Sequence, residues 1–383
     1  MKWISLLAVG LLLPMLALPV QAAGLEVAGK SAVLMDVATG TVLYESNPHE
    51  RLAPASVTKV MTMLLIMEAV DSGKIGWEDT VTASEAAAAK GGSQIYLKAG
   101  EQMSVRDMLK SIAVSSANDC ACAMAEHIAG SEGAFVAMMN ARAGELGMQD
   151  TTFVNCTGLD DAPEAGEHKT SAHDIALMSR QLLKYHPDIQ KFTTIWMDTV
   201  RNGAFGLSNT NKLVRFYQGA TGLKTGFTAA AGYCLSASAE REGLGLIAVV
   251  MGAPTSKERN AACKQLLDYG FANFALVAPE LEALPEVAVR LGQRPTVALQ
   301  MGDSAGLLVD KAKKSTVSTS LTLEPAVTAP VAKGQRLGTV KILSGQELLA
   351  EIPLTAAEAV PRLTWGELYR SILRRTCCAK ADS

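Results

Sequence analysis

Ser56 and Lys59 form the only S-x-x-K in this chain, and these residue types at this spacing can make an activated nucleophile. They open an apolar run, residues 56–70, that predicts a helix buried inside its domain. Residues three apart on a helix share a face, so the Lys59 amine can approach the Ser56 hydroxyl. Burial lowers the pKa of a lysine towards the neutral form, which accepts the serine proton. The helix start also favours the negative charge that develops on an attacked carbonyl.

Two further short sequences carry groups that suit a peptide substrate. Ser116 offers a hydroxyl that can relay a proton to a leaving amine, and Asn118 offers an amide that can hold a substrate backbone. In the sequence Lys224-Thr225-Gly226 the lysine can bind a carboxylate and the threonine can donate a hydrogen bond. The glycine leaves room for a substrate backbone beside a strand edge.

Each of the three sequences has an ordinary structural explanation when it is taken alone. S-x-x-K also occurs as a serine cap followed by a solvated lysine, S-x-N as a helix cap, and K-T-G as a turn. Together and in this order they resemble the motifs of penicillin-binding proteins and serine β-lactamases. Over about residues 30–276 the chain is most similar to the low-molecular-mass D-alanyl-D-alanine carboxypeptidases. The stretches that carry this similarity are L-A-P-A before Ser56, residues 92–97, residues 155–159 and T-G-L before Lys224.

The resemblance implies a serine peptidase that trims the terminal D-alanine from peptidoglycan stem peptides through an acyl-enzyme, with β-lactams as inhibitors and no cofactor. It implies three catalytic residues: Ser56 as nucleophile, Lys59 as general base and Ser116 as proton relay. It implies five substrate-binding residues: Asn118, Lys224, Thr225, Gly226 and Phe227. Lys224 would bind the substrate carboxylate, and Phe227 would supply the second backbone N–H for the oxyanion. Some family members have histidine in the place of Phe227, so only its backbone role is carried over.

These residues must be positioned by an α/β domain. Residues 31–37 and 41–45 predict a hairpin, and residues 232–241 and 244–251 predict two more strands. Helical patterns follow the hairpin and close the region, at residues 105–115, 117–129, 132–146, 171–185 (opened by Ser171) and 257–274. Strands at both ends with helices between them indicate one antiparallel sheet with a helical insert, as in the penicillin-binding-protein and β-lactamase fold.

A small all-β domain is predicted after the catalytic one. The composition changes near Pro279, and short alternating runs follow at residues 287–290, 296–300, 318–323 and 339–343. Extra strands of the first domain are the alternative, but the proline-containing break favours a separate unit. The predicted organisation is a signal peptide (1–23), a catalytic domain (24–276), a β domain (277–360) and an amphipathic tail (361–383).

The two ends of the chain indicate where the protein works. Lys2 precedes an apolar run, residues 4–18, that is shorter than the roughly 20 residues of a membrane span and leads to small residues at Ala22-Ala23. This pattern predicts a cleaved secretory signal, with a retained anchor as the alternative. Residues 363–378 place Trp365 and Tyr369 on one helical face and arginines on the other. The tail therefore suits an anionic membrane surface, or packing on the β domain. The predicted location is the cell envelope, on the outer face of the cytoplasmic membrane or secreted.

Composition argues against several other classes of protein. The net charge of −3 gives no reason to expect a nucleic-acid partner. The seven cysteines have no framework spacing, which disfavours a disulfide scaffold, and Cys120 and Cys122 fit buried positions in an apolar helix. The five histidines include no H-E-x-x-H, so no metal site is predicted.

Two other functions are compatible with parts of the pattern. A serine β-lactamase shares the three motifs, but no E-x-x-x-N lies between Asn118 and Lys224. The roughly one hundred residues after the catalytic region also exceed a compact single-domain enzyme. A non-catalytic cell-wall scaffolding protein is the second alternative, and it would not need Ser56 and Lys59 together.

Overall fold

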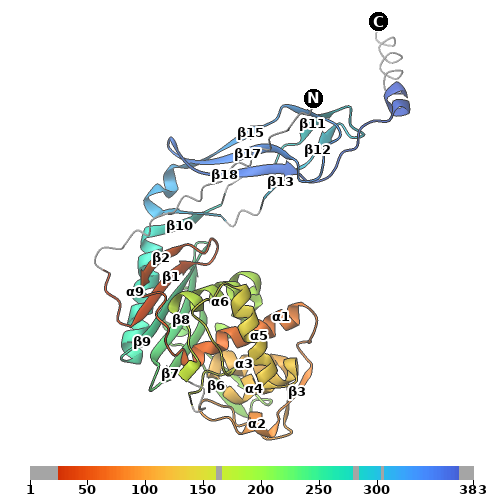
Figure 1. Ribbon diagram of the computed structural model, residues 1–383. Coiled ribbons are helices and arrows are strands. Elements are labelled where there is room, and N and C mark those ends of the chain that lie inside the picture. The colour runs from red at the N-terminus through yellow and green to blue at the C-terminus, as the bar shows by residue number, and fades with distance from the viewer. Residues whose placement is uncertain (1–24, 161–165, 279–283, 303–305, 371–383) are drawn as a thin grey trace, which may run out of the picture.

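A computed structural model describes residues 25–160, 166–278, 284–302 and 306–370 of the chain. The predicted signal peptide and the end of the predicted tail, with Cys377 and Cys378, lie outside these residues. Figure 1 shows two parts: one in which helices pack on a sheet, and one built of long strands that extends away from it.

A five-stranded antiparallel sheet, in the order β2-β1-β9-β8-β7, is the frame of the first part. Its strands are β1 (Ser31–Asp36), β2 (Val42–Ser46), β7 (Ala220–Thr228), β8 (Gly232–Arg241) and β9 (Leu244–Ala253). The early strand β1 pairs with the late strand β9, with Ala32 opposite Val250. The predicted sheet, built from both ends of the region, is therefore confirmed.

Helices bury both faces of this sheet (Figure 1). Alternate residues of β1 point to opposite faces, so Val33 and Met35 join one core while Ala32 and Leu34 join the other. The first core includes the helices α1 (Lys59–Asp71) and α6 (Ala172–Tyr185), and the second includes α9 (Ser256–Asn273). Burial on both faces explains why β9 is apolar almost throughout.

The predicted helical insert is confirmed, and it contains further short elements. Its other long helices are α3 (Val105–Ser115), α4 (Asn118–Ala129) and α5 (Glu132–Glu145). Ser171 caps α6 as predicted, with its Oγ accepting a hydrogen bond from the Asp174 backbone N–H. The elements of the insert that were not predicted are only three or four residues long: α2 (Glu85–Ala88), η3 (Pro187–Ile189), α7 (Gln190–Thr193), α8 (Leu213–Phe216), and the hairpins β3 (Thr80–Thr82) with β4 (Gln102–Ser104) and β5 (Met197–Val200) with β6 (Phe205–Ser208).

The second part is all-β, as predicted, with a core of its own that includes Val289, Val340 and Leu354. One sheet holds β11 (Val287–Arg290), β12 (Thr296–Val297) and β16 (Ala326–Thr328). The other runs in the order β13 (Leu299–Met301), β18 (Glu347–Ala356), β17 (Arg336–Ser344) and β15 (Val317–Leu323). The predicted strand at residues 296–300 is wrong in one respect, because it divides into β12 and β13. They pair in different sheets, at a corner where the chain passes from one sheet to the other.

A two-stranded ribbon joins the two parts. In it β10 (Phe274–Val277), which follows α9 directly, pairs with β14 (Leu307–Asp310). The 3-10 helix η4 (Lys311–Thr316) comes next, and its Lys311 Nζ donates to the Phe271 carbonyl at 2.9 Å.

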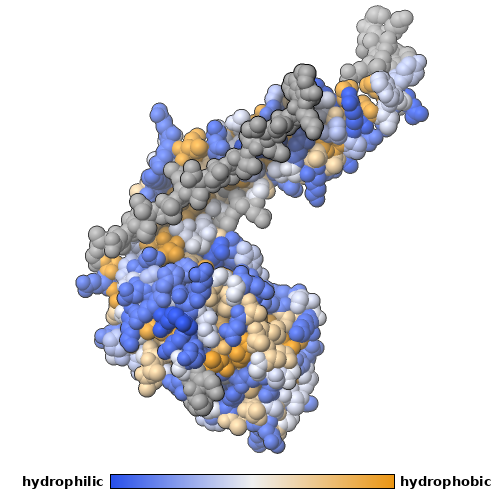
Figure 2. All heavy atoms as spheres, in the orientation of Figure 1, coloured by the Kyte–Doolittle hydropathy of each residue, from blue (hydrophilic) through white to orange (hydrophobic). Residues whose placement is uncertain are grey.

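The described end of the tail is helical from residue 365 to residue 370, where Trp365 and Tyr369 are 88% and 65% exposed. Across the described residues, no helix combines the length and apolar character that crossing a membrane requires. Figure 2 shows hydrophilic and apolar residues interspersed over the viewed face of both parts. Such mixing is usual for a folded protein, since apolar atoms make up much of any accessible surface.

Candidate active site

Ser56 and Lys59 lie in direct contact at the start of α1. Lys59 Nζ is 2.9 Å from Ser56 Oγ and 2.8 Å from the Thr157 carbonyl oxygen. The predicted start of the helix at Ser56 is wrong by one turn, because residues 55–58 form the 3-10 helix η1 and α1 begins at Lys59. Side chains at positions i and i+3 are eclipsed in a 3-10 turn, so this tighter turn brings the serine and the lysine together.

The Lys59 amine is fully buried, and burial lowers its pKa to about 7. The negative charge of Asp119 and the Cys156 thiol oppose this shift but do not cancel it. A large share of the amine is therefore neutral near neutral pH, and a neutral amine can take the hydroxyl proton of Ser56. The contact and the lowered pKa are what general-base activation of a serine requires.

A loop over residues 155–159 holds the lysine in place. Asn155 Oδ1 accepts hydrogen bonds from the backbone N–H groups of Thr157 and Gly158, at 3.1 and 2.7 Å. Thr62 Oγ1 donates to the Cys156 carbonyl at 2.6 Å, which ties the same loop to α1. Sequence reasoning assigned Thr157 no role, because it contributes a backbone carbonyl that every residue type has.

Ser116 and Asn118 lie at the junction of α3 and α4, where both residues have buried polar side-chain atoms. Ser116 ends α3 in the left-handed conformation, with φ 62°, and Asn118 begins α4. Ser116 Oγ and Asn118 Oδ1 are buried and have no hydrogen-bond partner among the described residues. Since buried polar atoms are normally paired, these two are suited to donors or acceptors of a substrate.

The K-T-G sequence lies within β7, the edge strand of the sheet, and not in a turn. Gly226 packs against η1 so closely that a Cβ there would lie 2.6 Å from the Pro54 carbonyl oxygen and 3.1 Å from the Ser56 backbone nitrogen. Only glycine lets the strand approach the nucleophile to this degree. Thr225 Oγ1 donates to Thr210 Oγ1 at 2.7 Å.

Lys224 is the second buried lysine of the site. Burial, helped by the positive charges of Lys59 and Arg259, holds its pKa well below the usual range. Its Nζ donates to the Thr225 carbonyl at 2.8 Å. An anionic substrate group brought next to this amine would favour its charged form.

The predicted residues are not all linked by direct contacts. Ser56 lies against both Lys59 and Gly226. Asn118 approaches the lysine-holding loop through Gly92, where a Cβ would meet both Asn118 Nδ2 and Leu159. The Phe227 side chain is 55% exposed and stacks on Tyr233, with ring centroids 4.3 Å apart. Its ring therefore lies at the surface beside the site.

Two buried side chains that sequence reasoning did not assign to the site support it from beneath. His168 Nε2 lies 2.8 Å from Thr58 Oγ1, which donates to the Ala55 carbonyl just before the nucleophile. Burial, with Lys59 nearby, lowers the pKa of His168 to about 4 and keeps the imidazole neutral. The Asp119 carboxylate accepts the backbone N–H groups of Ile95 and Leu97 and so fixes the loop over residues 92–97. Neither role has a signal in one sequence, since both depend on distant segments.

Metal and disulfide chemistry find no support in the described part of the chain. No group of three or more His, Cys, Asp or Glu residues is placed there to hold a metal ion. The five described cysteines, at 120, 122, 156, 234 and 263, are buried free thiols, which confirms the prediction for Cys120 and Cys122.

Comparison with known proteins gives consistent matches over both parts. Residues 18–255 match the family described as D-alanyl-D-alanine carboxypeptidase, and residues 281–362 match the C-terminal domain of penicillin-binding protein 5. The D-alanyl-D-alanine carboxypeptidase DacF of Bacillus subtilis is 46% identical over 86% of this chain and 85% of its own length.

Solved structures agree with these sequence matches. Penicillin-binding protein 5 from Haemophilus influenzae superposes with a TM-score of 0.73 and 33% identity, over 88% of this chain and 99% of that one. Penicillin-binding protein D2 from Listeria monocytogenes, in its cefotaxime-bound form, matches with a TM-score of 0.59 and 33% identity. That match covers 64% of this chain and 98% of the other.

Proposed function

Since the chain belongs to the D-alanyl-D-alanine carboxypeptidase family, we propose that Ser56 is the nucleophile that attacks the carbonyl between the two terminal D-alanines of a stem peptide. The protein is a hydrolase that removes the last D-alanine of peptidoglycan stem peptides through an acyl-enzyme, and penicillins inhibit it. An attacking serine needs a base, an oxyanion site and a proton for the leaving amine, and the residues around Ser56 can supply all three.

In the proposed reaction Lys59 takes the proton of Ser56 Oγ as that oxygen attacks. The backbone N–H groups of Ser56 and Phe227 stabilise the oxyanion, and Ser116 passes a proton to the leaving D-alanine. Water then cleaves the acyl-enzyme ester, again with Lys59 as the base. The 2.9 Å contact between Lys59 Nζ and Ser56 Oγ, with the lowered pKa of the amine, is the observation that carries this proposal.

The substrate would lie along the edge of β7 as an added strand. Gly226 brings that edge against the nucleophile, Thr225 offers its hydroxyl, and the Asn118 amide holds the peptide backbone. Lys224 would bind the carboxylate of the terminal D-alanine. Its burial supports this role, because a carboxylate restores the favourable charged state of a desolvated ammonium.

The test is intact-mass analysis after exposure to a fluorescent penicillin, with Ser56→Ala beside the wild type and D-alanine release followed in parallel. We expect a covalent adduct on the wild type alone, and D-alanine release by the wild type alone. An adduct or D-alanine release that persists in Ser56→Ala would remove the proposed nucleophile. A short-lived adduct with no D-alanine release would instead favour a β-lactamase.

The protein acts on peptidoglycan and so belongs to the cell envelope. We further propose that residues 1–23 export it and that the tail over residues 361–383 places it on the outer face of the cytoplasmic membrane. The exposed rings of Trp365 and Tyr369 support the second point, since such rings suit a membrane interface. A form ending at residue 360 should lose binding to anionic vesicles, and equal binding by both forms would contradict the proposed anchor.

The domain boundaries at residues 276 and 360 are part of the same proposal. The separate cores of the helical part and the β part support a division between them. In this arrangement the β part spaces the active site away from the surface that the tail binds.

A further inference from the structure

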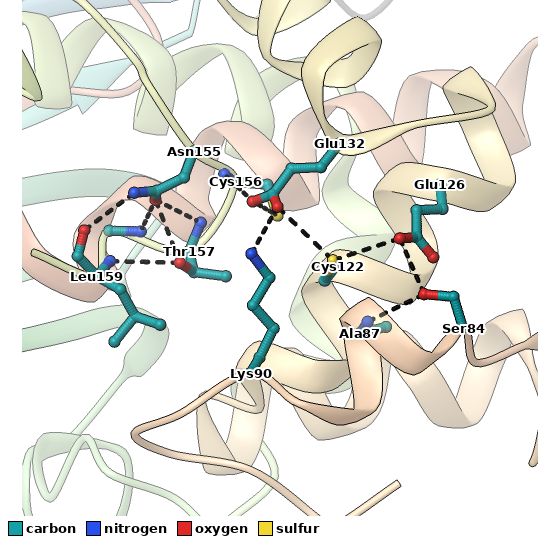
Figure 3. Close-up of polar contacts among 11 residues, drawn as sticks. Ser84, Ala87, Lys90, Cys122, Glu126, Glu132, Asn155, Cys156, Thr157 and Leu159 are labelled. Carbon is teal, nitrogen blue, oxygen red and sulfur yellow. Dashed lines mark hydrogen bonds and ion pairs between the residues drawn. The ribbon is translucent and has the colours of Figure 1, made fainter. Parts of the chain in front are cut away.

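Glu132, the first residue of α5, lies between the two loops that flank the catalytic centre (Figure 3). Its Oε1 accepts hydrogen bonds from the backbone N–H and the thiol of Cys156, both at 3.2 Å. Its Oε2 accepts from Lys90 Nζ at 2.6 Å. The Glu132 and Lys90 side chains are only 23% and 25% exposed, so one carboxylate joins the two loops in a largely shielded place.

On one side, the Glu132 carboxylate binds Cys156, the neighbour of the residue whose carbonyl holds the general base. Cys156 directly precedes Thr157, whose carbonyl oxygen accepts the hydrogen bond from Lys59 Nζ. The Glu132 contact to the Cys156 backbone therefore lies one residue away from that carbonyl. A shift of this backbone would move the acceptor that fixes the lysine amine beside Ser56.

On the other side, the same carboxylate binds Lys90, the neighbour of the residue whose carbonyl holds the side-chain amide of Asn118. Lys90 directly precedes Gly91, whose carbonyl oxygen accepts a hydrogen bond from Asn118 Nδ2 at 2.7 Å. Neither loop belongs to a helix or strand at these residues, so neither has a ladder of backbone bonds to hold its shape. A charge-assisted bond at each loop supplies that constraint.

We propose that Glu132 is a positioning residue for the acylation of Ser56, because its single carboxylate fixes the loop that holds Lys59 and the loop that holds Asn118. This inference rests on the roles proposed above for those two residues. A displacement of about 1 Å in a reacting or orienting group can lower a rate by up to about 100-fold. Partly shielded ion pairs add little net stability, so the value of this one lies in where it holds the loops.

The chain offers a matched control in the pair between Arg142 and Glu68. Their side chains are 22% and 26% exposed and lie 2.8 Å apart, much as in the Lys90–Glu132 pair. The control pair joins α5 to α1, yet it makes no contact with either loop. Glu68→Gln therefore removes a similarly shielded ion pair without releasing the catalytic loops, and Arg142 keeps its second partner, Glu145.

The experiment compares Glu132→Gln, Lys90→Met, the double variant and Glu68→Gln in the full-length protein. The readouts are the rate constant for acylation by saturating fluorescent penicillin from pH 5 to pH 9, and the melting temperature. Glu132→Gln keeps an oxygen for the Cys156 N–H and loses the ion pair, so we expect its plateau rate to fall roughly 5- to 10-fold. Lys90→Met should fall by a similar factor, and the double variant no further, because the two side chains act as one unit.

If the Lys90–Glu132 pair acted only through its charges, the pH profiles of the variants would differ from those expected for positioning. Removing the negative charge of Glu132 would lower the pKa of Lys59, whereas removing the positive charge of Lys90 would raise it. The acidic limb of the pH profile would then move in opposite directions in the two single variants, and the plateau would stay unchanged. If the pair acts by positioning, the plateau rate is lower in both single variants, and the acidic limbs do not move in opposite directions.

The inference is overturned if both single variants keep the wild-type plateau within twofold while Ser56→Ala forms no adduct. It is also overturned if Glu68→Gln lowers the plateau as much as Glu132→Gln, since the cause would then be general destabilisation. An adduct on Ser56→Ala would overturn the proposed function itself, and this inference with it. Lowered plateaus in Glu132→Gln and Lys90→Met, with Glu68→Gln at the wild-type rate, would establish the positioning role.

Discussion

The two parts of the molecule treat polar side chains in opposite ways. In the catalytic part Lys59, Lys224 and Asp119 are buried, together with the polar atoms of Ser116 and Asn118. In the β part, every buried side chain among residues 284–302 and 306–360 is apolar. Burying an ionisable group costs free energy unless its partners compensate for the lost water. The catalytic part accepts this cost because desolvation gives a lysine the pKa of a base, whereas the β part has a core optimised for packing alone.

Replacing the general base should separate activity from stability most strongly. Lys59→Met should slow acylation by fluorescent penicillin about 1000-fold, because Ser56 loses its base. Relative to the wild type, the same variant should be more stable at pH 7 than at pH 11 by about 4 kcal/mol, because the wild-type amine has a pKa of about 7 in the fold and 10.5 when unfolded. This difference develops as the pH falls from 10.5 to about 7 and is constant below.

Stopped-flow acylation and urea unfolding at pH 7 and pH 11 would check both parts of this prediction. The exposed lysine Lys264 provides the control, since Lys264→Met should change neither quantity. Acylation within tenfold of the wild type in Lys59→Met would contradict the contrast between the two parts.

Acidification should remove the same activity without a mutation. The acylation rate at saturating penicillin should fall about tenfold per pH unit below a midpoint near 7, reaching about 100-fold at pH 5, as Lys59 becomes protonated. His168 should not contribute in this range, because its pKa is lowered to about 4. A flat profile between pH 5 and pH 8 would show that the buried amine is not the base. Saturation matters because protonation of Lys224 at low pH would strengthen carboxylate binding and mask the effect.

Adding a single methyl group at Gly226 should lower the acylation rate less than the loss of the general base. Gly226→Ala places a Cβ against the Pro54 carbonyl and the Ser56 N–H, so β7 must move away from η1. Acylation should fall roughly 10- to 100-fold, as expected for a displaced oxyanion site and substrate strand. Gly206→Ala on β6 is the matched control, since no atom lies within 4 Å of its added Cβ. Equal rates in the two variants would mean that the close approach of β7 is not needed.

A cavity in the β core should have the smallest effect on chemistry. Leu354→Ala removes a fully buried side chain and should lower the stability of the β part by about 3 kcal/mol. The acylation rate should stay within twofold of the wild type, because the β core shares no cluster with the catalytic part. A loss comparable to that of Gly226→Ala would show that the two parts are coupled through the β10–β14 ribbon.

Local pattern was enough for the elements with strong periodicity. The strand at residues 232–241 and the helix capped by Ser171 were predicted because their side-chain alternation and cap are written in neighbouring residues. The single predicted strand at residues 296–300 was wrong, since its division between two sheets depends on partners far along the chain. The strand β18 was not predicted, because Glu351 and Pro353 interrupt its apolar pattern.

The sequence by itself determined which residues meet within one turn: Ser56 and Lys59 are three apart, and any helical turn brings them together. It also indicated the type of chemistry, because S-x-x-K, S-x-N and K-T-G occur together and in this order. Only the tertiary structure decided how deeply Lys59 is buried, that Thr157 holds it, and that Gly226 closes the site against the Ser56 backbone. Those contacts join segments about 100 to 170 residues apart through backbone atoms, which are the same in every residue and leave no trace in a single sequence.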